Sequence, residues 1–385
     1  MLYLSGIILS FFLCVVLITK RNKSYADCIL AAWLGVIGFH LLTFYLFSTN
    51  QQFSYPTLVA LGFPLPLAQG PFLYLYTRQQ TSDAPFDKKQ LLHFLPVLCS
   101  YLLFASFYFL PFDQKIEVFQ HKGQGFKIHM LINLYPIFVS GILYVILSLV
   151  RLIKYRKNLV NQFSNTEKIN FNWLLYLIIW MMVIWITILF TRNDKLIFGS
   201  VSLFVIWLGY FSIKQVQVYS QNTKNQHPES SSADDSNAFN AVEDLTENVT
   251  AGIIDNSDNL KYQKSALNEK DISKIYESLK HLMFENKPYT NPDLTLNDLA
   301  KDLKVHPNHL SQVINSKEHK NFYDLINERR VQEFKKLVSL SSNQKYTLMA
   351  IAYDCGFNSK ASFNRNFKKY TGLTPSNYLQ KHLEK

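Results

Sequence analysis

A segment near the end of the chain combines hydrogen-bonding and cationic side chains at helical spacing. Phe363, Phe367 and Tyr370 recur every three or four positions, which predicts a helix with one buried face. The opposite face carries the polar residues Lys360, Ser362, Asn364, Arg365, Lys368 and Lys369. Amides and hydroxyls can hydrogen-bond to base edges, and Arg and Lys can pair with phosphates. This helix therefore has the chemistry needed to read nucleic acid.

The residues just before this segment predict a shorter helix and a tight turn. The stretch from Thr347 to Phe357 is mainly apolar, and Gly356 can adopt the left-handed conformation that closes a helix. Ser359 can then cap the helix that follows. A short helix, a tight turn and a second helix with an outward polar face together predict a helix-turn-helix unit.

The same arrangement is predicted a second time upstream. Thr295 and Asp298 have the spacing of a capping box, and Pro307 fits the first turn of the next helix. The apolar residues of this pair are Leu296, Leu299, Ala300, Leu303, Leu310, Val313 and Ile314. An amphipathic helix over Phe322–Val338 should join the two units, and a first helix should begin near Asp271.

The stretch from about Glu269 to His382, close to a third of the chain, resembles the DNA-binding domain of the AraC/XylS family. The most specific part runs from Ile351 to Leu379. It contains the Ile-Ala, Gly-Phe, Phe-x-x-x-Phe-Lys-x-x-x-Gly and Pro-x-x-Tyr elements of the family in register. The resemblance implies two helix-turn-helix units joined by a rigid helix, with recognition helices in successive major grooves about 34 Å apart.

The resemblance also implies which residues contact DNA. In the second recognition helix they are Lys360, Ser362, Asn364 and Arg365 toward bases and Lys368 on the backbone. In the first they are Asn308, Ser311, Gln312 and Asn315. Two residues depart from the family pattern: His319 replaces a usual Gly, and Gln312 stands where a basic residue is common. Because the first helix lacks Lys and Arg, it should contribute less phosphate affinity.

The first half of the chain is far more apolar. Seven stretches without Asp, Glu, Lys or Arg have about the ~20 residues that a membrane-spanning helix needs. They are Leu2–Thr19, Cys28–Thr49, Thr57–Thr77, Leu91–Pro111, Ile128–Val150, Phe171–Thr191 and Leu196–Ile213. Since they show no polar face, the sequence predicts a transmembrane bundle rather than a soluble helical core.

Basic residues in the connecting loops predict the orientation of this bundle. The odd-numbered loops hold eleven Lys and Arg residues, and the alternate loops hold five. The predicted location is the inner (cytoplasmic) membrane. The positive-inside rule places the N-terminus outside and the chain from Lys214 onward in the cytoplasm. A DNA-binding C-terminal domain requires the same orientation, and the two arguments are independent.

The sequence contains few residues suited to cofactor or metal chemistry. The four cysteines form no CxxC pair and no zinc-ligand spacing, so no cofactor, metal site or disulfide is expected. Uncharged polar residues do occur within the apolar spans: His40, Gln69, His93, His129, Asn133 and Asn172. A structural role is the more common one for such residues, although polar groups in membranes are often functional.

The predicted organisation is all-α, with three parts. Residues 1–213 form the transmembrane bundle, residues 214–268 form a flexible acidic linker, and residues 269–385 form the double helix-turn-helix domain. The linker is rich in Ser, Asn and Asp around Asn225–Ala238 and lacks helical periodicity. The net charge of +11 for the chain favours an acidic partner such as DNA or anionic lipid.

These features predict a membrane-anchored, sequence-specific transcription regulator whose bundle senses an envelope or membrane signal. Its expected partners are double-stranded DNA, the lipid bilayer, RNA polymerase and an unidentified signal ligand, and the resemblance leaves homodimers open. The alternative is a transporter or channel with a cytoplasmic DNA-binding domain. An enzyme is not expected, because the sequence has no phosphate-binding loop, catalytic carboxylate pair or nucleophile–base arrangement.

Overall fold

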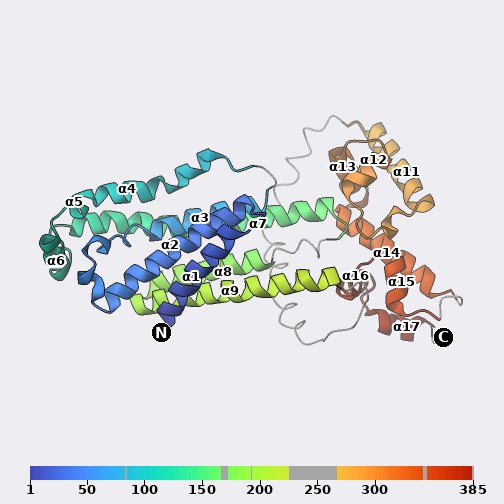
Figure 1. The fold of residues 1–385 in the computed structure, drawn as a ribbon. Coiled ribbons are helices and arrows are strands. Elements are labelled where there is room, and N and C mark those ends of the chain that lie inside the picture. Colours follow the sequence, from blue (N-terminus) through green and yellow to red (C-terminus); the bar gives the residue numbers. More distant parts are fainter. Residues whose placement is uncertain (83–84, 166–171, 192, 225–266, 341–344, 384–385) are drawn as a thin grey trace. The chain divides into compact units, whose positions relative to one another are not determined.

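The computed structural model describes residues 1–82, 85–165, 172–191, 193–224, 267–340 and 345–383. The chain divides into two compact units. One comprises Met1–Leu152 and Phe171–Ser231, and the other comprises Ile153–Asn170 and Ser232–Lys385. The described residues form helices and one isolated bridge between Phe163 and Thr295, which confirms the all-α fold class (Figure 1).

The N-terminal unit begins with two long helices that pack against each other and against the last helix of the unit. Its helices are α1 (Leu2–Thr19), α2 (Tyr25–Ser48), η1 (Gln51–Ser54), η2 (Pro56–Leu58), α3 (Pro66–Gln80), η3 (Lys88–Phe94), α4 (Leu95–Leu103), α5 (Ala105–Tyr108), α6 (Phe112–Gln120), α7 (Lys127–Gln162), α8 (Asn172–Phe190) and α9 (Asp194–Lys224). Helix α7 extends from this unit into the C-terminal one.

Five helices in the described part of the chain are long and apolar enough to cross a membrane. They are α1, α2, α7, α8 and the Asp194–Phe211 part of α9. The other two expected spans contain shorter helices. Only 15 residues form α3, which starts at Pro66, and the segment from Lys88 to Tyr108 is divided among η3, α4 and α5. A span count of seven therefore remains a prediction.

The N-terminal unit carries apolar side chains both inside and outside. Trp33, Leu177 and Ile178 are buried in its core. On its surface, apolar residues such as Ile128 and Phe190 are 72% and 83% exposed. Because water disfavours such a surface and lipid does not, the distribution fits helices that face a bilayer.

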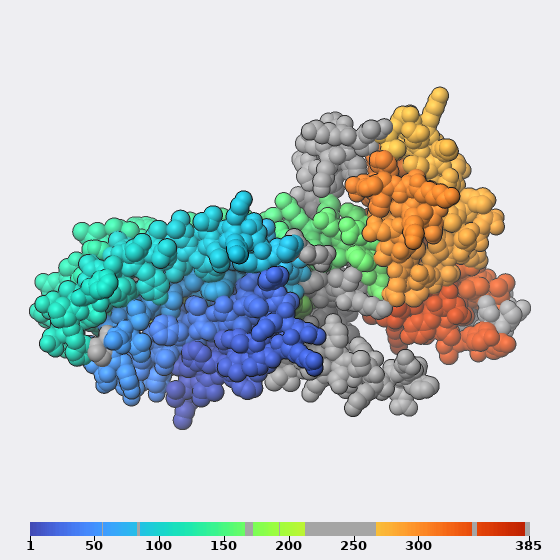
Figure 2. Space-filling view, turned by 45° about the horizontal axis from the view of Figure 1, so that its top comes forward, coloured from blue at the N-terminus to red at the C-terminus, as the bar shows by residue number. Residues whose placement is uncertain are grey.

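The C-terminal unit contains two small hydrophobic cores. Its helices are α11 (Glu269–Glu285), η5 (Pro288–Thr290), α12 (Leu296–Asp302), α13 (Pro307–Glu318), α14 (Phe322–Val338), α15 (Leu348–Asp354), α16 (Lys360–Thr371) and α17 (Pro375–Leu383). One core joins α11–α13 to the start of α14, and the other joins the end of α14 to α15–α17. Figure 2 shows the first group in yellow to orange and the second in red.

Local sequence signals account for the ends of these helices. Helix α14 has the predicted bounds Phe322–Val338. Thr295 and Asp298 form the expected capping box, and the Ser359 hydroxyl accepts a hydrogen bond from the Ser362 amide at 3.0 Å. Helix α9 continues to Lys224, beyond the expected end of the last span, and residues 225–266 of the predicted linker lie outside the described residues.

Candidate nucleic-acid interface

The first helix-turn-helix unit consists of α12, a short turn and α13. Ala300 is completely buried, and its carbonyl oxygen accepts a hydrogen bond from the Val305 amide at 2.9 Å across the turn. Pro307 occupies the first turn of α13, as predicted, and the His306 side chain caps the helix by accepting a bond from the Asn308 amide. The small side chain at position 300 and the tight turn let the two helices pack closely.

The surface of α13 carries the four residues expected to contact DNA. Asn308 is exposed, and Ser311, Gln312 and Asn315 are partly exposed. The opposite face, formed by Leu310, Val313 and Ile314, is buried, and Leu310 and Ile314 belong to the first core. The structure therefore brings these predicted residues together on the accessible side of α13, with uncharged hydrogen-bonding groups.

Helix α13 ends at His319 in a left-handed conformation, with φ 54° and ψ 34°. This is the position where the family usually has Gly. A residue with a Cβ atom adopts this conformation at a cost of about 1–2 kcal/mol. The His319 amide donates a hydrogen bond to the Asn315 carbonyl oxygen at 3.1 Å, so the turn forms despite that cost. The departure from the family pattern is therefore accommodated locally.

The second helix-turn-helix unit consists of α15, a turn at Gly356 and α16. Gly356 has φ 94°, and the adjacent Phe357 amide donates to the Ala352 carbonyl oxygen at 3.1 Å, which closes the end of α15. A Cβ atom on Gly356 would lie 2.3 Å from the Tyr289 carbonyl oxygen. Only Gly fits here, because the position needs both a positive φ and a close approach to the backbone of Tyr289 and Thr290.

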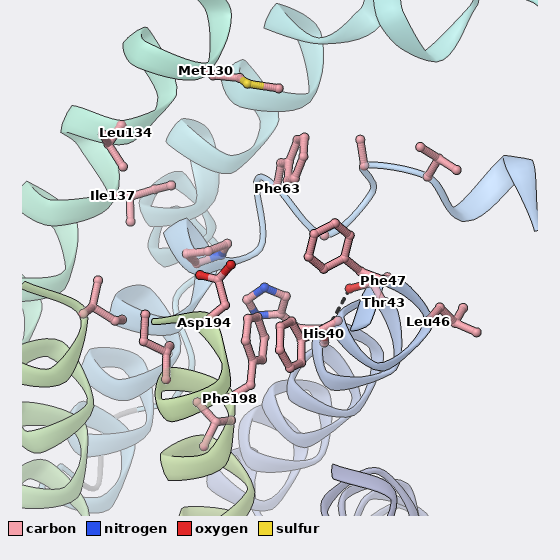
Figure 3. A pocket seen from close by; sticks show the side chains of 18 of the residues that line it. His40, Thr43, Leu46, Phe47, Phe63, Met130, Leu134, Ile137, Asp194 and Phe198 are labelled. Carbon is pink, nitrogen blue, oxygen red and sulfur yellow. Dashed lines mark hydrogen bonds between the residues drawn. The ribbon is translucent and has the colours of Figure 1, made fainter. Parts of the chain in front are cut away.

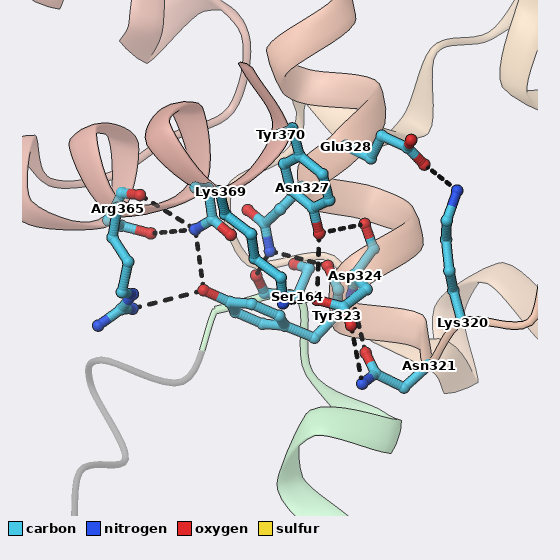
Figure 4. Close-up of polar contacts among 12 residues, drawn as sticks. Ser164, Lys320, Asn321, Tyr323, Asp324, Asn327, Glu328, Arg365, Lys369 and Tyr370 are labelled. Atoms are coloured by element: carbon cyan, nitrogen blue, oxygen red, sulfur yellow. Dashed lines mark hydrogen bonds and ion pairs between the residues drawn. The ribbon is translucent and has the colours of Figure 1, made fainter. Parts of the chain in front are cut away.

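The accessible face of α16 is the more basic of the two. Lys360, Asn364, Arg365 and Lys368 are all exposed, as predicted from their spacing. One guanidinium nitrogen of Arg365, Nη2, lies 3.4 Å from the Tyr323 hydroxyl oxygen (Figure 4). This contact orients a long cationic side chain without neutralising it. The face offers an amide for base edges and cations for phosphates.

The expectation that Ser362 faces outward is wrong. Its side chain is 5% exposed, and its hydroxyl and carbonyl oxygens both accept hydrogen bonds from the Asn366 side-chain amide, at 3.4 and 3.0 Å. Asn366 also donates to the Tyr323 hydroxyl at 2.9 Å. Ser362 lies in the first turn of α16, on the side that packs toward α14, so it helps to position the helix instead of presenting a group to DNA.

Two residues that the sequence pattern did not predict, Tyr323 and Asp324, hold α16 against α14. The Tyr370 hydroxyl donates to the Asp324 carbonyl oxygen at 3.0 Å, and the Lys369 ammonium pairs with the Asp324 carboxylate at 2.9 Å. Burial and the neighbouring Asp324 charge raise the pKa of Tyr370 well above its usual value. Lys369 is therefore engaged in an ion pair within the domain.

A buried cation, Arg330, lies in the middle of α14 and is 1% exposed. Its Nε donates to the Tyr289 carbonyl oxygen at 2.7 Å, and its Nη2 donates to the Asn291 carbonyl oxygen at 2.8 Å. Burial lowers the pKa of Arg330 to about 10, so the side chain remains charged at neutral pH. Arg330 lies four positions from both Ile326 and Phe334. This helical spacing is the signal in the sequence that could have revealed its place on their buried face.

Ser164, in the segment that follows α7, belongs to the same compact unit and contacts the same region. The Ser164 hydroxyl donates to the Leu294 carbonyl oxygen at 2.7 Å. Its own carbonyl oxygen accepts from the Asn327 side-chain amide at 3.0 Å (Figure 4). Neighbouring Phe163 forms the isolated bridge with Thr295. Sequence patterns did not indicate this contact, because the partners lie 130 or more positions apart.

A comparison with protein families identifies the same region. Residues 299–381 match the model of a helix-turn-helix domain family. A protein of unknown function from Listeria innocua is 28% identical, with 28% of this chain and 96% of that chain covered and a TM-score of 0.24. The C-terminal domain of AraT, a response regulator from Geobacillus stearothermophilus, is 25% identical, with 31% and 89% covered and a TM-score of 0.25. A comparison with curated proteins finds no match.

The matched residues run from Leu299 in α12 to Lys381 in α17, and they include both recognition helices, α13 and α16. They contain eight of the nine residues expected to contact DNA in exposed or partly exposed positions, with Ser362 as the exception. Residues 299–381 therefore form a helix-turn-helix domain of the AraC/XylS type, and the chain is a DNA-binding transcription regulator with that domain.

Proposed function

We propose that this regulator is anchored in a membrane by its N-terminal unit and recognises specific DNA sequences through α13 and α16. The observation that carries the proposal is the presence, in one chain, of five apolar helices of membrane-spanning length and an AraC/XylS-type domain. Anchoring restricts the domain to DNA near the membrane. It also allows a signal at the membrane to alter transcription without a separate messenger.

The distribution of Lys and Arg among the loops supports an N-terminus outside and a C-terminal domain in the cytoplasm. Fusing a reporter that is active only in the cytoplasm to successive loops would test this orientation. Activity after Lys23, Lys89 and Lys157, and inactivity after Gln51 and Lys122, is the expected pattern. The reverse pattern would place the DNA-binding domain outside and contradict the proposal.

Residues on the two recognition helices have different proposed roles. Asn364 and Arg365 on α16 contact base edges, with Lys360 beside them, and Lys368 contacts the phosphate backbone. On α13, Asn308, Ser311, Gln312 and Asn315 contact bases through uncharged groups. Because the cations are concentrated on α16, that helix supplies most of the salt-dependent affinity.

Selection from a random pool of double-stranded DNA would test sequence recognition. The full chain in lipid nanodiscs should enrich one sequence, and Arg365→Ala should weaken binding to it by about tenfold or more. Lys336→Ala is the control, since Lys336 is exposed and belongs to α14 and not to a recognition helix. Failure to prefer any sequence over the starting pool would overturn the proposal.

We further propose that the membrane unit senses a signal and passes it to the DNA-binding domain. RNA polymerase and a second copy of the chain are proposed partners at the promoter. The alternative of a transporter or channel predicts solute flux in sealed vesicles. In the N-terminal unit, the interior residues with least exposure are mainly apolar, which does not favour an ion pathway.

A further inference from the structure

The N-terminal unit contains a partly open cavity of about 670 Å³. Its walls come from the C-terminal part of α2, the segment around η1 and η2, the start of α3, α5, α6, the start of α7, the second half of α8 and the start of α9. An engineered cavity of about 150 Å³ is large enough to hold benzene, and typical ligand pockets measure about 300–1,000 Å³. The cavity thus has the size of a site for a small organic molecule.

The walls of the cavity are predominantly aromatic and aliphatic. Phe44 and Phe198 stack with ring centroids 3.8 Å apart, and Phe63 stacks on Phe119 at 6.5 Å. Figure 3 shows Phe63, Phe198 and Ile137 around the open space. Apolar surface of this kind favours an apolar ligand, because burial of its surface contributes about 25 cal/mol per Å².

Three side chains in this wall have nitrogen atoms available to donate a hydrogen bond. The Trp185 residue is 4% exposed, and its indole nitrogen Nε1 has no hydrogen-bond partner among the described residues. The His40 imidazole points into the cavity from α2 (Figure 3). The Gln69 carbonyl oxygen accepts from Trp33 Nε1 at 2.7 Å, which leaves the amide nitrogen of Gln69 as the donor. A buried donor without a partner is destabilising, so an acceptor bound here would be stabilising.

The two charged residues that line the cavity have opposite signs. Asp194 lies at the start of α9, and Lys122 lies just after α6. An ionised ligand would gain attraction from one of these residues and repulsion from the other. It would also lose its hydration among aromatic rings, which is unfavourable for a buried charge. The cavity therefore favours an uncharged ligand.

We infer that this cavity binds an uncharged amphiphile with an apolar body and one hydrogen-bond-accepting head group, such as a hydroxyl or carbonyl. The head group accepts from Trp185, His40 or Gln69, and the body packs against the phenylalanine rings. The inference deepens the proposed sensing role and uses its orientation, in which the loops beside the cavity lie outside. It identifies the chemical class of the signal that the membrane unit would detect.

Trp185 provides a direct reporter of binding. The probe is 11-bromo-1-undecanol, whose bromine quenches nearby indole fluorescence, titrated onto the full chain in lipid nanodiscs. Occupation of the cavity should give saturable quenching above the linear background of probe dissolved in lipid. Trp185→Phe should remove the saturable part. Linear quenching alone in the wild-type chain would overturn the inference.

Variants of the wall test where the probe binds. Val201→Phe fills part of the cavity and should weaken the saturable binding at least about tenfold. Val183→Phe, the same change at a residue 44% exposed outside the cavity, should leave binding unchanged. His40→Phe should weaken it about fivefold, with exposed His121→Phe as its control. Equal effects in both members of a pair would contradict a site in this cavity.

Two further experiments identify the class of ligand. Decanol should compete with the probe better than decanoate or decyltrimethylammonium, and equal competition by a charged compound would overturn the uncharged head group. Nanodiscs with brominated phosphatidylcholine test for a lipid tail in the cavity. Saturable quenching by that lipid that decanol does not reduce would overturn the inference, because the occupant would then be a bilayer lipid with a charged head group. None of these readouts requires DNA, so a failure to bind DNA would not affect them.

Discussion

The side-chain amide of Asn327 donates a hydrogen bond to the backbone carbonyl oxygen of Ser164 at 3.0 Å. One turn further along α14, Arg330 Nη2 donates to the Ser164 hydroxyl oxygen at 3.1 Å. Arg330 also donates to the backbone carbonyl oxygens of Tyr289, Asn291 and Ser164, so it satisfies backbone groups from two separate segments. The polar centre of the C-terminal unit therefore depends on side chains from α14.

Replacement of Arg330 by Met should destabilise the C-terminal unit by about 2–4 kcal/mol, because it leaves buried carbonyl oxygens without donors. Urea unfolding of residues 153–385, followed by circular dichroism, would measure the change. Neighbouring Arg329→Met is the control and should cost less than about 1 kcal/mol, since Arg329 is partly exposed. Similar losses for the two variants would contradict this role for Arg330.

The bridge between Phe163 and Thr295 predicts an intramolecular cross-link. Paired residues in such a bridge have Cα atoms about 4.5–5.5 Å apart, within the range that a disulfide spans. Phe163→Cys combined with Thr295→Cys, in a chain whose natural cysteines are replaced, should oxidise readily. Gel mobility before and after reduction would detect it. Phe163→Cys combined with Ser339→Cys should stay reduced, and equal oxidation of both pairs would contradict the bridge.

Local signals in the sequence were sufficient to predict most of the C-terminal domain. The bounds of α14, the capping box at Thr295 and the turn at Gly356 each depend on residues a few positions apart. Ser362 was assigned to the wrong face because its burial depends on tertiary packing. Its partner Asn366 also donates to Tyr323, which lies 43 positions earlier in the chain. Only tertiary packing reveals such a pair.

The membrane half was less predictable in detail. Apolar stretches without charge predicted the long helices, but they did not predict that Lys88–Tyr108 would divide into three short helices. The cavity beside His40 was not predicted either. It results from how the helix ends and the segment around η1 pack together, which one-dimensional hydrophobicity does not contain.

His319→Gly should stabilise the domain by about 1 kcal/mol, because Gly adopts the left-handed conformation at position 319 without the Cβ penalty. The midpoint of urea unfolding should rise while its slope stays constant. Ser316→Gly is the control: Ser316 is exposed inside α13, and Gly there should cost about 0.5–1 kcal/mol. A loss of stability in His319→Gly would show that its side chain makes a compensating contact.

Cys355 should resist thiol reagents while the domain is folded. The residue is completely buried, and burial raises the pKa of its thiol to about 12. The folded state therefore keeps the thiol neutral, whereas the unfolded chain ionises near its ordinary pKa of about 8.5. Stability should fall as pH rises from about 9 toward 12, because ionisation favours the unfolded state.

Reaction of residues 269–385, which contain Cys355 as their sole cysteine, with a chromogenic disulfide at pH 8 would test this. Colour should develop only after urea is added. Ala361→Cys places an exposed thiol on α16 as a positive control and should react at once. Rapid reaction of Cys355 in the folded wild-type domain would contradict its burial.

The two recognition helices should differ in their response to salt. Lys368→Ala should weaken binding to all sequences alike and should reduce the slope of log affinity against log salt by about one unit, because one phosphate contact is lost. Asn364→Ala should instead relax the preference at one base position with little change in slope. Fluorescence anisotropy with labelled DNA at several salt concentrations would separate the two effects.

Ser362→Ala provides a third comparison on the same helix. Since Ser362 is buried against Asn366, this change should lower the stability of the domain without altering sequence preference.

Gln312→Lys on α13 should have the opposite effect to Lys368→Ala, because it adds a phosphate contact and steepens the salt dependence of DNA binding. If Gln312→Lys left the slope unchanged, α13 would not lie near the DNA backbone, and recognition by α16 alone would account for binding.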